Sequence, residues 1–230
     1  MLQIKGLDAY YGESRIMRGL DMSVERGKIV CLIGRNGVGK STTLKSIMGL
    51  VKTPAGSILF DGREMIKMPA YSRAKLGIGY VPQGRDIFPQ MTVQENMELG
   101  LRAIGSRAKV PDYIYELFPA LPKFAKRRGG DLSGGQQQQL AIARALVTEP
   151  KILILDEPTE GIQPSVIEDI GAAVRRINEW KGVTVLMVEQ YLDFVMGISD
   201  YLYVMEKGII VLEGHTMELD AENVQNIMTN

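Results

Sequence analysis

One short glycine-rich segment, GRNGVGKS at residues 34–41, constrains this chain more than any other feature. It follows KIVCLIG at 28–34, whose apolar run predicts a buried strand, and it precedes KSTTLKSIMG at 40–49, which predicts a helix ended by Gly49. The spacing matches G-x-x-x-x-G-K-[ST] in the strand-to-helix context that the motif requires. A chance glycine-rich turn would rarely combine all three features. The sequence therefore predicts an α/β core that binds a polyphosphate where this strand ends.

The residues of this loop suit a nucleoside triphosphate. Gly34, Gly37 and Gly39 allow the backbone to wrap closely around phosphate groups. Exposed N–H groups and the start of the helix attract the anion. Lys40 is expected to reach the β- and γ-phosphates, and the Ser41 hydroxyl is expected to bind Mg²⁺. The loop does not say which kind of nucleotide-dependent protein this is.

Composition narrows the remaining classes. The 27 basic residues balance the 27 acidic ones, so the positive charge of a nucleic-acid-binding domain is missing. The single cysteine excludes an internal disulfide and fits a reducing compartment. No stretch has the 18 or more consecutive apolar residues of a membrane span. Any work at a membrane is therefore expected to depend on another chain.

Strands alternate with helices along the chain, which favours a largely parallel α/β core. The elements expected from the pattern are a β-rich segment to Val24, a hairpin at 57–65 around Asp61-Gly62, strands at 77–83, 151–158 and 183–188, a mostly helical stretch at about 91–148 with polar loops near Ser106 and at 126–131, a helix at 164–180 and a hairpin at 201–214. The helical stretch between two strand-rich parts predicts an inserted subdomain.

A second buried strand, KILILDEP at 151–158, ends in two carboxylates. Asp156 is expected at the carboxyl end of the strand, where it would hold Mg²⁺ through water. Glu157 points elsewhere and is expected to orient and polarise the water that attacks the γ-phosphate. Alone, the pair fits a solvated turn equally well, but the phosphate loop favours the catalytic interpretation.

A second anion site is predicted at LSGGQ, residues 132–136, directly before a helix. Ser133, Gly134 and Gly135 would place a hydroxyl and bare N–H groups at the helix start. Two half-sites on one chain suggest a head-to-tail dimer, with each nucleotide between one phosphate loop and the partner's LSGGQ. With this segment the chain resembles the ATP-binding cassette (ABC) ATPases, whose signature is LSGGQ, over essentially its whole length.

The resemblance implies the ABC ATPase fold, which is a P-loop NTPase core with an amino-terminal antiparallel β region and an inserted helical subdomain. Residues 1–230 are then one domain. Residues 1–90 and 149–230 would form the RecA-like catalytic and β subdomains, and 91–148 the helical subdomain with the signature motif.

Two further site residues come from the resemblance alone. Gln83 matches the Q-loop glutamine, which contacts Mg²⁺ or water and reports to the transmembrane partner. Tyr11 matches the aromatic residue that stacks on adenine. Gln163 stands where the family often has Asp, so D-loop chemistry is not transferred to it.

The strand predicted at 183–188 ends in Glu189 and Gln190. Most of the family has histidine at the second position, and histidine carries a charge near neutral pH whereas glutamine cannot. Gln190 can still donate N–H to a γ-phosphate oxygen and is expected to be a neutral sensor of that phosphate. Glu189 is expected either to orient Gln190 or to face solvent.

Together these assignments define the predicted site. The residues expected to be catalytic are Lys40, Glu157 and Gln190. Those expected to bind ATP are Tyr11, Gly34, Arg35, Asn36, Gly37, Val38, Gly39, Lys40, Ser41, Thr42, Gln83, Ser133, Gly134, Gly135 and Gln136. Those expected to bind Mg²⁺ are Ser41, Gln83 and Asp156.

The short middle domain, with no regulatory domain or fused membrane span, resembles the ATPase subunits of importers for hydrophobic amino acids and amides. Residues 34–41 and 82–85 are most similar to the second ATPase subunit of urea importers, whereas the branched-chain amino acid subunit more often reads ANGAGK and PEGR there. The resemblance implies transmembrane permease subunits bound near Gln83–Asn96, a second ATPase subunit, no nucleic acid, and a cytoplasmic position on the inner face of the cell membrane.

Two other classes stay open. Soluble cassette ATPases of DNA repair or translation usually carry two cassettes, coiled-coil insertions or basic extensions, and none of these is visible here. A nucleotide-gated binding module that does not hydrolyse ATP is opposed by Lys40, Asp156 and Glu157, although Gln190 keeps it open.

Overall fold

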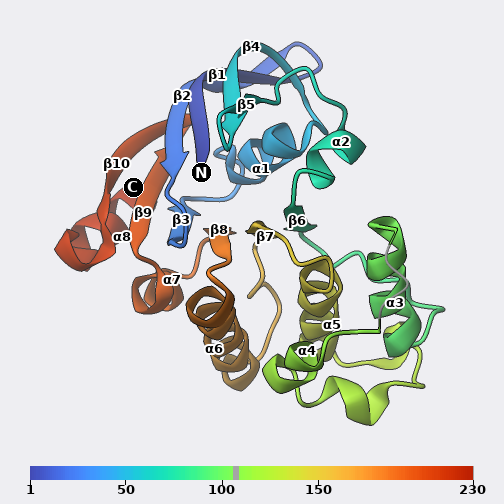
Figure 1. The fold of residues 1–230 in the computed structure, drawn as a ribbon. Helices are drawn as coiled ribbons and strands as arrows, with labels where there is room; N and C mark the ends of the chain where they lie inside the picture. The colour runs from blue at the N-terminus through green and yellow to red at the C-terminus, as the bar shows by residue number, and fades with distance from the viewer. Residues whose placement is uncertain (106–108, 230) are drawn as a thin grey trace.

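The computed structural model of this chain describes residues 1–105 and 109–229 (Figure 1). The strands are β1 (Leu2–Tyr11), β2 (Ser14–Val24), β3 (Ile29–Ile33), β4 (Lys52–Phe60), β5 (Arg63–Glu64), β6 (Ile78–Val81), β7 (Ile152–Asp156), β8 (Thr184–Glu189), β9 (Tyr201–Glu206) and β10 (Ile209–His215). The helices are α1 (Lys40–Met48), α2 (Ala70–Ala74), α3 (Val93–Ala103), α4 (Asp112–Leu117), α5 (Gly134–Leu146), α6 (Pro164–Lys181), α7 (Leu192–Ile198) and α8 (Ala221–Thr229). The polar loop expected near Ser106 lies outside the described residues.

A six-stranded sheet in the order β10-β9-β3-β8-β7-β6 forms the centre of the molecule. Its strands β3, β7 and β8 pair in parallel and are buried along their whole length. Strands covered on both faces read as continuous apolar runs, which explains their sequences. The register places Ile33 beside Glu189 and Asp156 beside Val188. Three strand ends thus meet at one edge, where open α/β sheets bind their ligands.

The two faces of this sheet enter separate hydrophobic cores. Val30, Leu32 and Val188 pack with α1 and with the antiparallel sheet β2-β1-β4-β5. Cys31 and Leu155 belong to the other core, which includes residues of α3 to α8. Figure 1 shows the antiparallel sheet and α1 on one side of the central strands, and helices α4, α5 and α6 on the other.

This architecture confirms the predicted fold class, with its amino-terminal antiparallel β region and its helices α3, α4 and α5 between residues 91 and 148. The hairpin turn lies where expected, and Asp61 and Gly62 have φ angles of 49° and 79°, as a primed turn requires. Within the described residues, no helix combines the length and hydrophobicity needed to cross a membrane.

Candidate nucleotide-binding site

The glycine-rich loop joins β3 to α1 and packs tightly against neighbouring backbone. A Cβ atom at Gly34 would lie 2.3 Å from the carbonyl oxygen of Met205 on β9, so a larger residue does not fit there. Gly39 precedes α1 with a φ of 117°, a conformation that other residues rarely adopt. The loop tip at residues 35–37 is exposed, as phosphate binding requires.

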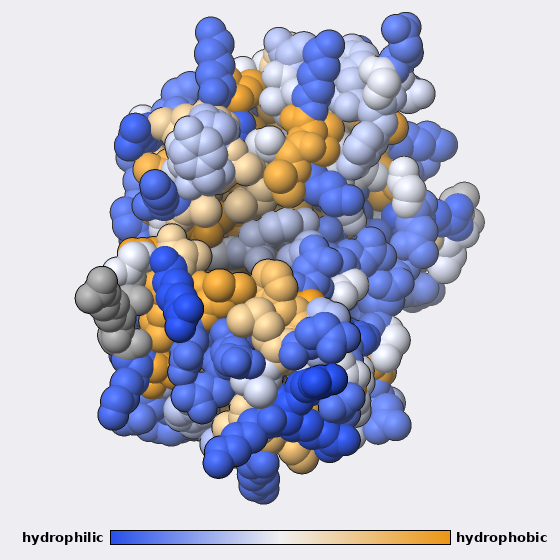
Figure 2. All heavy atoms as spheres, turned by 90° about the vertical axis from the view of Figure 1, so that its right-hand side faces the viewer, coloured by the Kyte–Doolittle hydropathy of each residue, from blue (hydrophilic) through white to orange (hydrophobic). Residues whose placement is uncertain are grey.

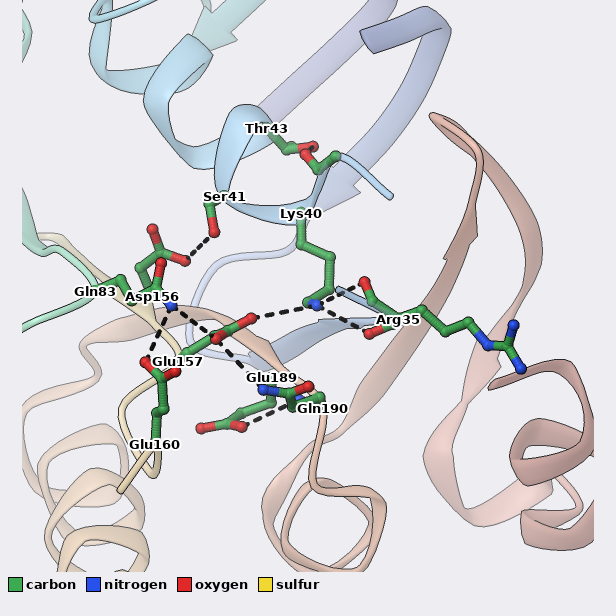
Figure 3. A network of polar contacts seen from close by, with 12 residues as sticks. Arg35, Lys40, Ser41, Thr43, Gln83, Asp156, Glu157, Glu160, Glu189 and Gln190 are labelled. Carbon is green, nitrogen blue, oxygen red and sulfur yellow. Dashed lines mark hydrogen bonds and ion pairs between the residues drawn. The ribbon is translucent and has the colours of Figure 1, made fainter. Parts of the chain in front are cut away.

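Lys40 begins α1 and turns its side chain back into the loop (Figure 3). Its Nζ donates to the carbonyl oxygens of Gly34 at 2.9 Å and Arg35 at 3.0 Å. The same Nζ lies 3.3 Å from a carboxylate oxygen of Glu157, and the two side chains are only 3% and 5% exposed. A buried ammonium group therefore lies where the phosphates are expected, held by oxygen atoms that phosphate oxygens can replace.

Ser41 and Asp156 form the second pair of the site (Figure 3). The Ser41 hydroxyl donates to Asp156 Oδ1 at 2.8 Å, and the Tyr80 hydroxyl donates to Oδ2 at 3.4 Å. Burial raises the pKa of Asp156, and the hydrogen bond from Ser41 and the charge of Lys45 oppose that rise. A hydroxyl and a buried carboxylate are hard oxygen donors, which fit Mg²⁺.

Side chains that follow several strands contact the Glu157 carboxylate. Besides Lys40, it accepts hydrogen bonds from Gln83 Nε2 at 3.2 Å and from Gln190 Nε2 at 3.5 Å. Gln83 follows β6, Glu157 follows β7 and Gln190 follows β8. The structure therefore brings together residues that the sequence could only assign one by one. The hydrogen bonds from Gln83 and Gln190 orient the Glu157 carboxylate.

Two carboxylates outside the predicted catalytic and metal-binding sets lie beside this cluster. Glu160 accepts a hydrogen bond from Gln83 Nε2 at 3.0 Å. Glu189 is 1% exposed and accepts from the backbone N–H groups of Thr159 at 2.9 Å and Gln190 at 3.1 Å. Burial raises the pKa of Glu189 against these donors. The alternative in which Glu189 faces solvent is therefore wrong, and the preceding apolar run was the only signal of its burial.

The LSGGQ segment begins α5. The Ser133 hydroxyl accepts from the Gln136 N–H at 3.4 Å, and the Gln136 side chain accepts from the Ser133 N–H at 3.0 Å, which forms a capping box. Throughout the part of the chain that the structure describes, no hydrogen bond or ion pair joins this segment to Lys40 or Glu157.

Tyr11 and Arg35 differ in how they relate to the cluster. Tyr11 ends β1 and is 49% exposed, which leaves its ring able to stack on a base. The Arg35 guanidinium turns away from Lys40, and its Nε donates to the carbonyl oxygen of Met228 on α8 at 2.6 Å (Figure 3). Only the carbonyl of Arg35 faces the buried ammonium group.

Comparisons with known proteins identify the family of this chain. The family model described as ABC transporter matches residues 17–160. The high-affinity branched-chain amino acid transport ATP-binding protein BraG of Pseudomonas aeruginosa is 38% identical over 218 residues, which cover 92% of this chain and 91% of that protein. The probable branched-chain amino acid transport ATP-binding protein LivF of Archaeoglobus fulgidus is 37% identical, with 95% and 94% covered.

Solved structures extend the similarity to the whole chain. The ADP conformation of an ATP-binding cassette of an ABC transporter is 31% identical with a TM-score of 0.82, and the match covers 100% of this chain and 95% of that one. A dimeric cassette in a post-hydrolysis state, bound to ADP and Pi, is 26% identical with a TM-score of 0.84, and 94% and 99% are covered.

Proposed function

This chain is a member of the ABC transporter family and an ATPase of that family, and we propose that it energises an importer by hydrolysing ATP at the site around Lys40 and Glu157. One observation carries the proposal. Two pairs meet where β3 and β7 end, with Lys40 Nζ 3.3 Å from Glu157 and Ser41 Oγ 2.8 Å from Asp156. Together they supply a cation that can bind phosphate, a metal site and a candidate base.

Each residue of the cluster has a distinct task in this proposal. Lys40 and the N–H groups of the loop hold the β- and γ-phosphates, and Tyr11 stacks on adenine. Ser41 and Asp156, with the amide oxygen of Gln83, would hold Mg²⁺, which neutralises charge on the phosphates when bound.

The reaction itself depends on the groups around Glu157. Its carboxylate orients a water molecule for in-line attack on the γ-phosphate and accepts its proton. Gln190 donates N–H to a γ-phosphate oxygen as a neutral sensor. The work of the site is positioning and charge stabilisation, as in phosphoryl transfer generally.

A complete site requires two cassettes. We assign Ser133, Gly134, Gly135 and Gln136 to the nucleotide bound on the partner, because within the described residues no hydrogen bond or ion pair joins them to Lys40 or Glu157 and the start of α5 suits an anion. The partner is a second copy or a sister ATPase subunit. Dimeric ABC transporter cassettes among the solved structures support this arrangement.

The docking surface for a permease is assigned to residues 83–96. This segment links Gln83, which touches Glu157, to the first turn of α3. Figure 2 shows the face that carries α2 and α3, which is hollowed between its upper and lower halves, with hydrophobic residues around the hollow. Phe88 and Tyr71 are 43% and 68% exposed. A permease bound there would hold the protein at the inner face of the cell membrane.

Relatives and motifs support different transported solutes. Similarity to BraG and LivF favours branched-chain amino acids. The sequence of residues 34–41 and 82–85 favours urea. The solute passes through other subunits, so this chain carries no contact that decides between them.

Reconstitution tests the proposal. The chain should co-purify with tagged permease subunits, and the ATPase rate of the assembled complex should rise with the transported solute, leucine tested against urea. A chain that hydrolyses ATP but never binds a permease is instead a soluble cassette ATPase. If neither solute changes the ATPase rate of the complex, both assignments of the transported solute are refuted.

A further inference from the structure

We propose that Glu189 is a positioning residue, whose buried carboxylate fixes the turn after Glu157 to the backbone of Gln190. It thereby sets how the side chains of Glu157 and Gln190 face one another. The inference rests on the proposed role of Glu157 in hydrolysis, and goes beyond it by adding a buried residue that acts through the backbone of Thr159 and Gln190.

The turn after β7 needs external support. Glu157 has a φ of 48°, a left-handed conformation that non-glycine residues adopt only when their surroundings hold them there. Strand β8 holds this turn at both ends. The Val188 carbonyl accepts from the Glu157 N–H at 2.9 Å, and the Glu189 carboxylate accepts from the Thr159 N–H at 2.9 Å.

The second oxygen of the same carboxylate holds Gln190. Glu189 Oε2 accepts from the Gln190 N–H at 3.1 Å, and Gln190 Nε2 lies 3.5 Å from Glu157 Oε2. One side chain therefore anchors the backbone of Gln190 and that of Thr159, two residues after Glu157, and the side chains of Gln190 and Glu157 meet at the expected γ-phosphate position (Figure 3). A carboxylate accepts at both oxygens, whereas a glutamine amide accepts at only one.

A purely structural role does not explain this residue well. Glu189 ends a strand of apolar residues and is 1% exposed, and burying a carboxylate is unfavourable unless hydrogen bonds compensate. Both compensating hydrogen bonds go to the Thr159 turn and to Gln190. The buried Glu189 carboxylate therefore joins the turn after β7 to the residue after β8.

The test compares Glu189→Gln with a matched loss elsewhere on β8. Thr184 at the other end of the strand is fully buried, and its hydroxyl accepts from the Gly27 N–H at 2.9 Å. Thr184→Val removes this hydrogen bond to backbone, together with the 3.1 Å contact of the hydroxyl to Met1 Sδ, without approaching the site. Glu189→Asp, which keeps the charge but is one methylene shorter, is the second variant, and Glu157→Gln is measured in the same series.

Steady-state ATPase and hydrogen exchange are measured on the purified chain. We expect Glu189→Gln and Glu189→Asp to lower kcat at least tenfold with the KM for ATP within twofold, and Thr184→Val to leave kcat within twofold. Independently of turnover, the amide of Thr159 should exchange at least tenfold faster in Glu189→Gln but not in Thr184→Val. A double variant that combines Glu189→Gln with Gln190→Ala should have a kcat only slightly below that of the less active single variant, because the two residues act as one unit.

The outcomes separate the two claims. If Glu157→Gln is inactive while the Glu189 variants keep normal kcat and Thr159 exchange, positioning by Glu189 is wrong and the proposed function stands. If Glu157→Gln keeps its activity, the proposed function fails first. Equal losses of kcat in Glu189→Gln and Thr184→Val would reduce Glu189 to a structural role and overturn the inference. If Glu189→Gln does not fold, a folded Glu189→Asp with normal kcat overturns it as well.

Discussion

Replacing Glu157 by glutamine should slow hydrolysis and strengthen ATP binding at the same time. The two effects come from different contacts of one carboxylate. As the proposed base, Glu157 contributes to the chemical step, and its loss should lower kcat about 100-fold, which corresponds to roughly 3 kcal/mol of barrier. As the buried partner of Lys40 at 3.3 Å, it competes with the phosphates for that cation.

The size of the second effect follows from the structure. Two charges at 3.3 Å attract by about 5 kcal/mol at an effective dielectric constant of about 20, and most of this is offset by their burial. The glutamine oxygen still accepts a hydrogen bond from Lys40, whose two carbonyl contacts also remain. We therefore expect the nucleotide-free variant to lose about 1–2 kcal/mol, or about 3–6 °C in Tm.

Removing a negative charge beside the γ-phosphate should then tighten ATP binding about tenfold, which is worth about 1.4 kcal/mol. At saturating ligand this becomes a thermal shift about 3–5 °C larger than that of the wild type. The assay is a thermal melt with Mg²⁺ and a non-hydrolysable ATP analogue, alongside steady-state ATPase. ADP is the ligand control, because it lacks the γ-phosphate and should produce a smaller difference.

Glu160→Gln is the matched variant, since it removes a carboxylate that contacts Gln83 instead of Lys40. It should bind the ATP analogue within about twofold of the wild type. The reasoning is refuted if Glu157→Gln and Glu160→Gln give the same thermal shift, or if Glu157→Gln hydrolyses ATP at the normal rate.

Three further changes test other parts of the molecule. Arg73 is 2% exposed and donates to four backbone carbonyls near α1, so Arg73→Met should cost about 4 kcal/mol and lower the Tm by about 10 °C in a thermal melt, with Arg73→Lys intermediate. Gln190→His should raise the ATPase rate of the purified chain or of a reconstituted complex, and no change in either would argue against a γ-phosphate sensor. Phe88→Asp should reduce transport by a reconstituted complex while ATP affinity stays within twofold, and unchanged transport would remove this surface from the proposed interface.

Local patterns in the sequence predict most of this site. Asp156 ends the buried strand β7, and Lys40 and Ser41 begin α1 directly after the glycine-rich loop that follows the buried strand β3. The register of a parallel sheet brings such strand ends to one edge. The fold class follows from the same alternation of strands and helices. What these signals have in common is that each depends on neighbours in the chain.

The missed contacts depend on residues far apart in the sequence. The sequence allows two alternatives for Glu189, because its Thr159 partner lies 30 positions away and no spacing rule connects them. No local pattern points to Glu160, because its contact is with Gln83, 77 positions away. Arg73 matches no functional motif, although its guanidinium donates hydrogen bonds to four backbone carbonyls in the fold. Charged residues of this kind become interpretable only when the surfaces that bury them are known.

The arrangement around Glu157 also suggests why hydrolysis can respond to a distant partner. Its three side-chain contacts come from elements with different attachments: Lys40 from the phosphate loop, Gln190 from the end of β8, and Gln83 from the segment that leads to α3. The first two lie on segments that follow the buried strands β3 and β8. The third lies at the start of residues 83–96, the proposed permease surface, so a displacement of this segment changes the donors around the carboxylate without disturbing the phosphate loop. Coupling through Gln83 should therefore alter kcat more than the affinity for ATP.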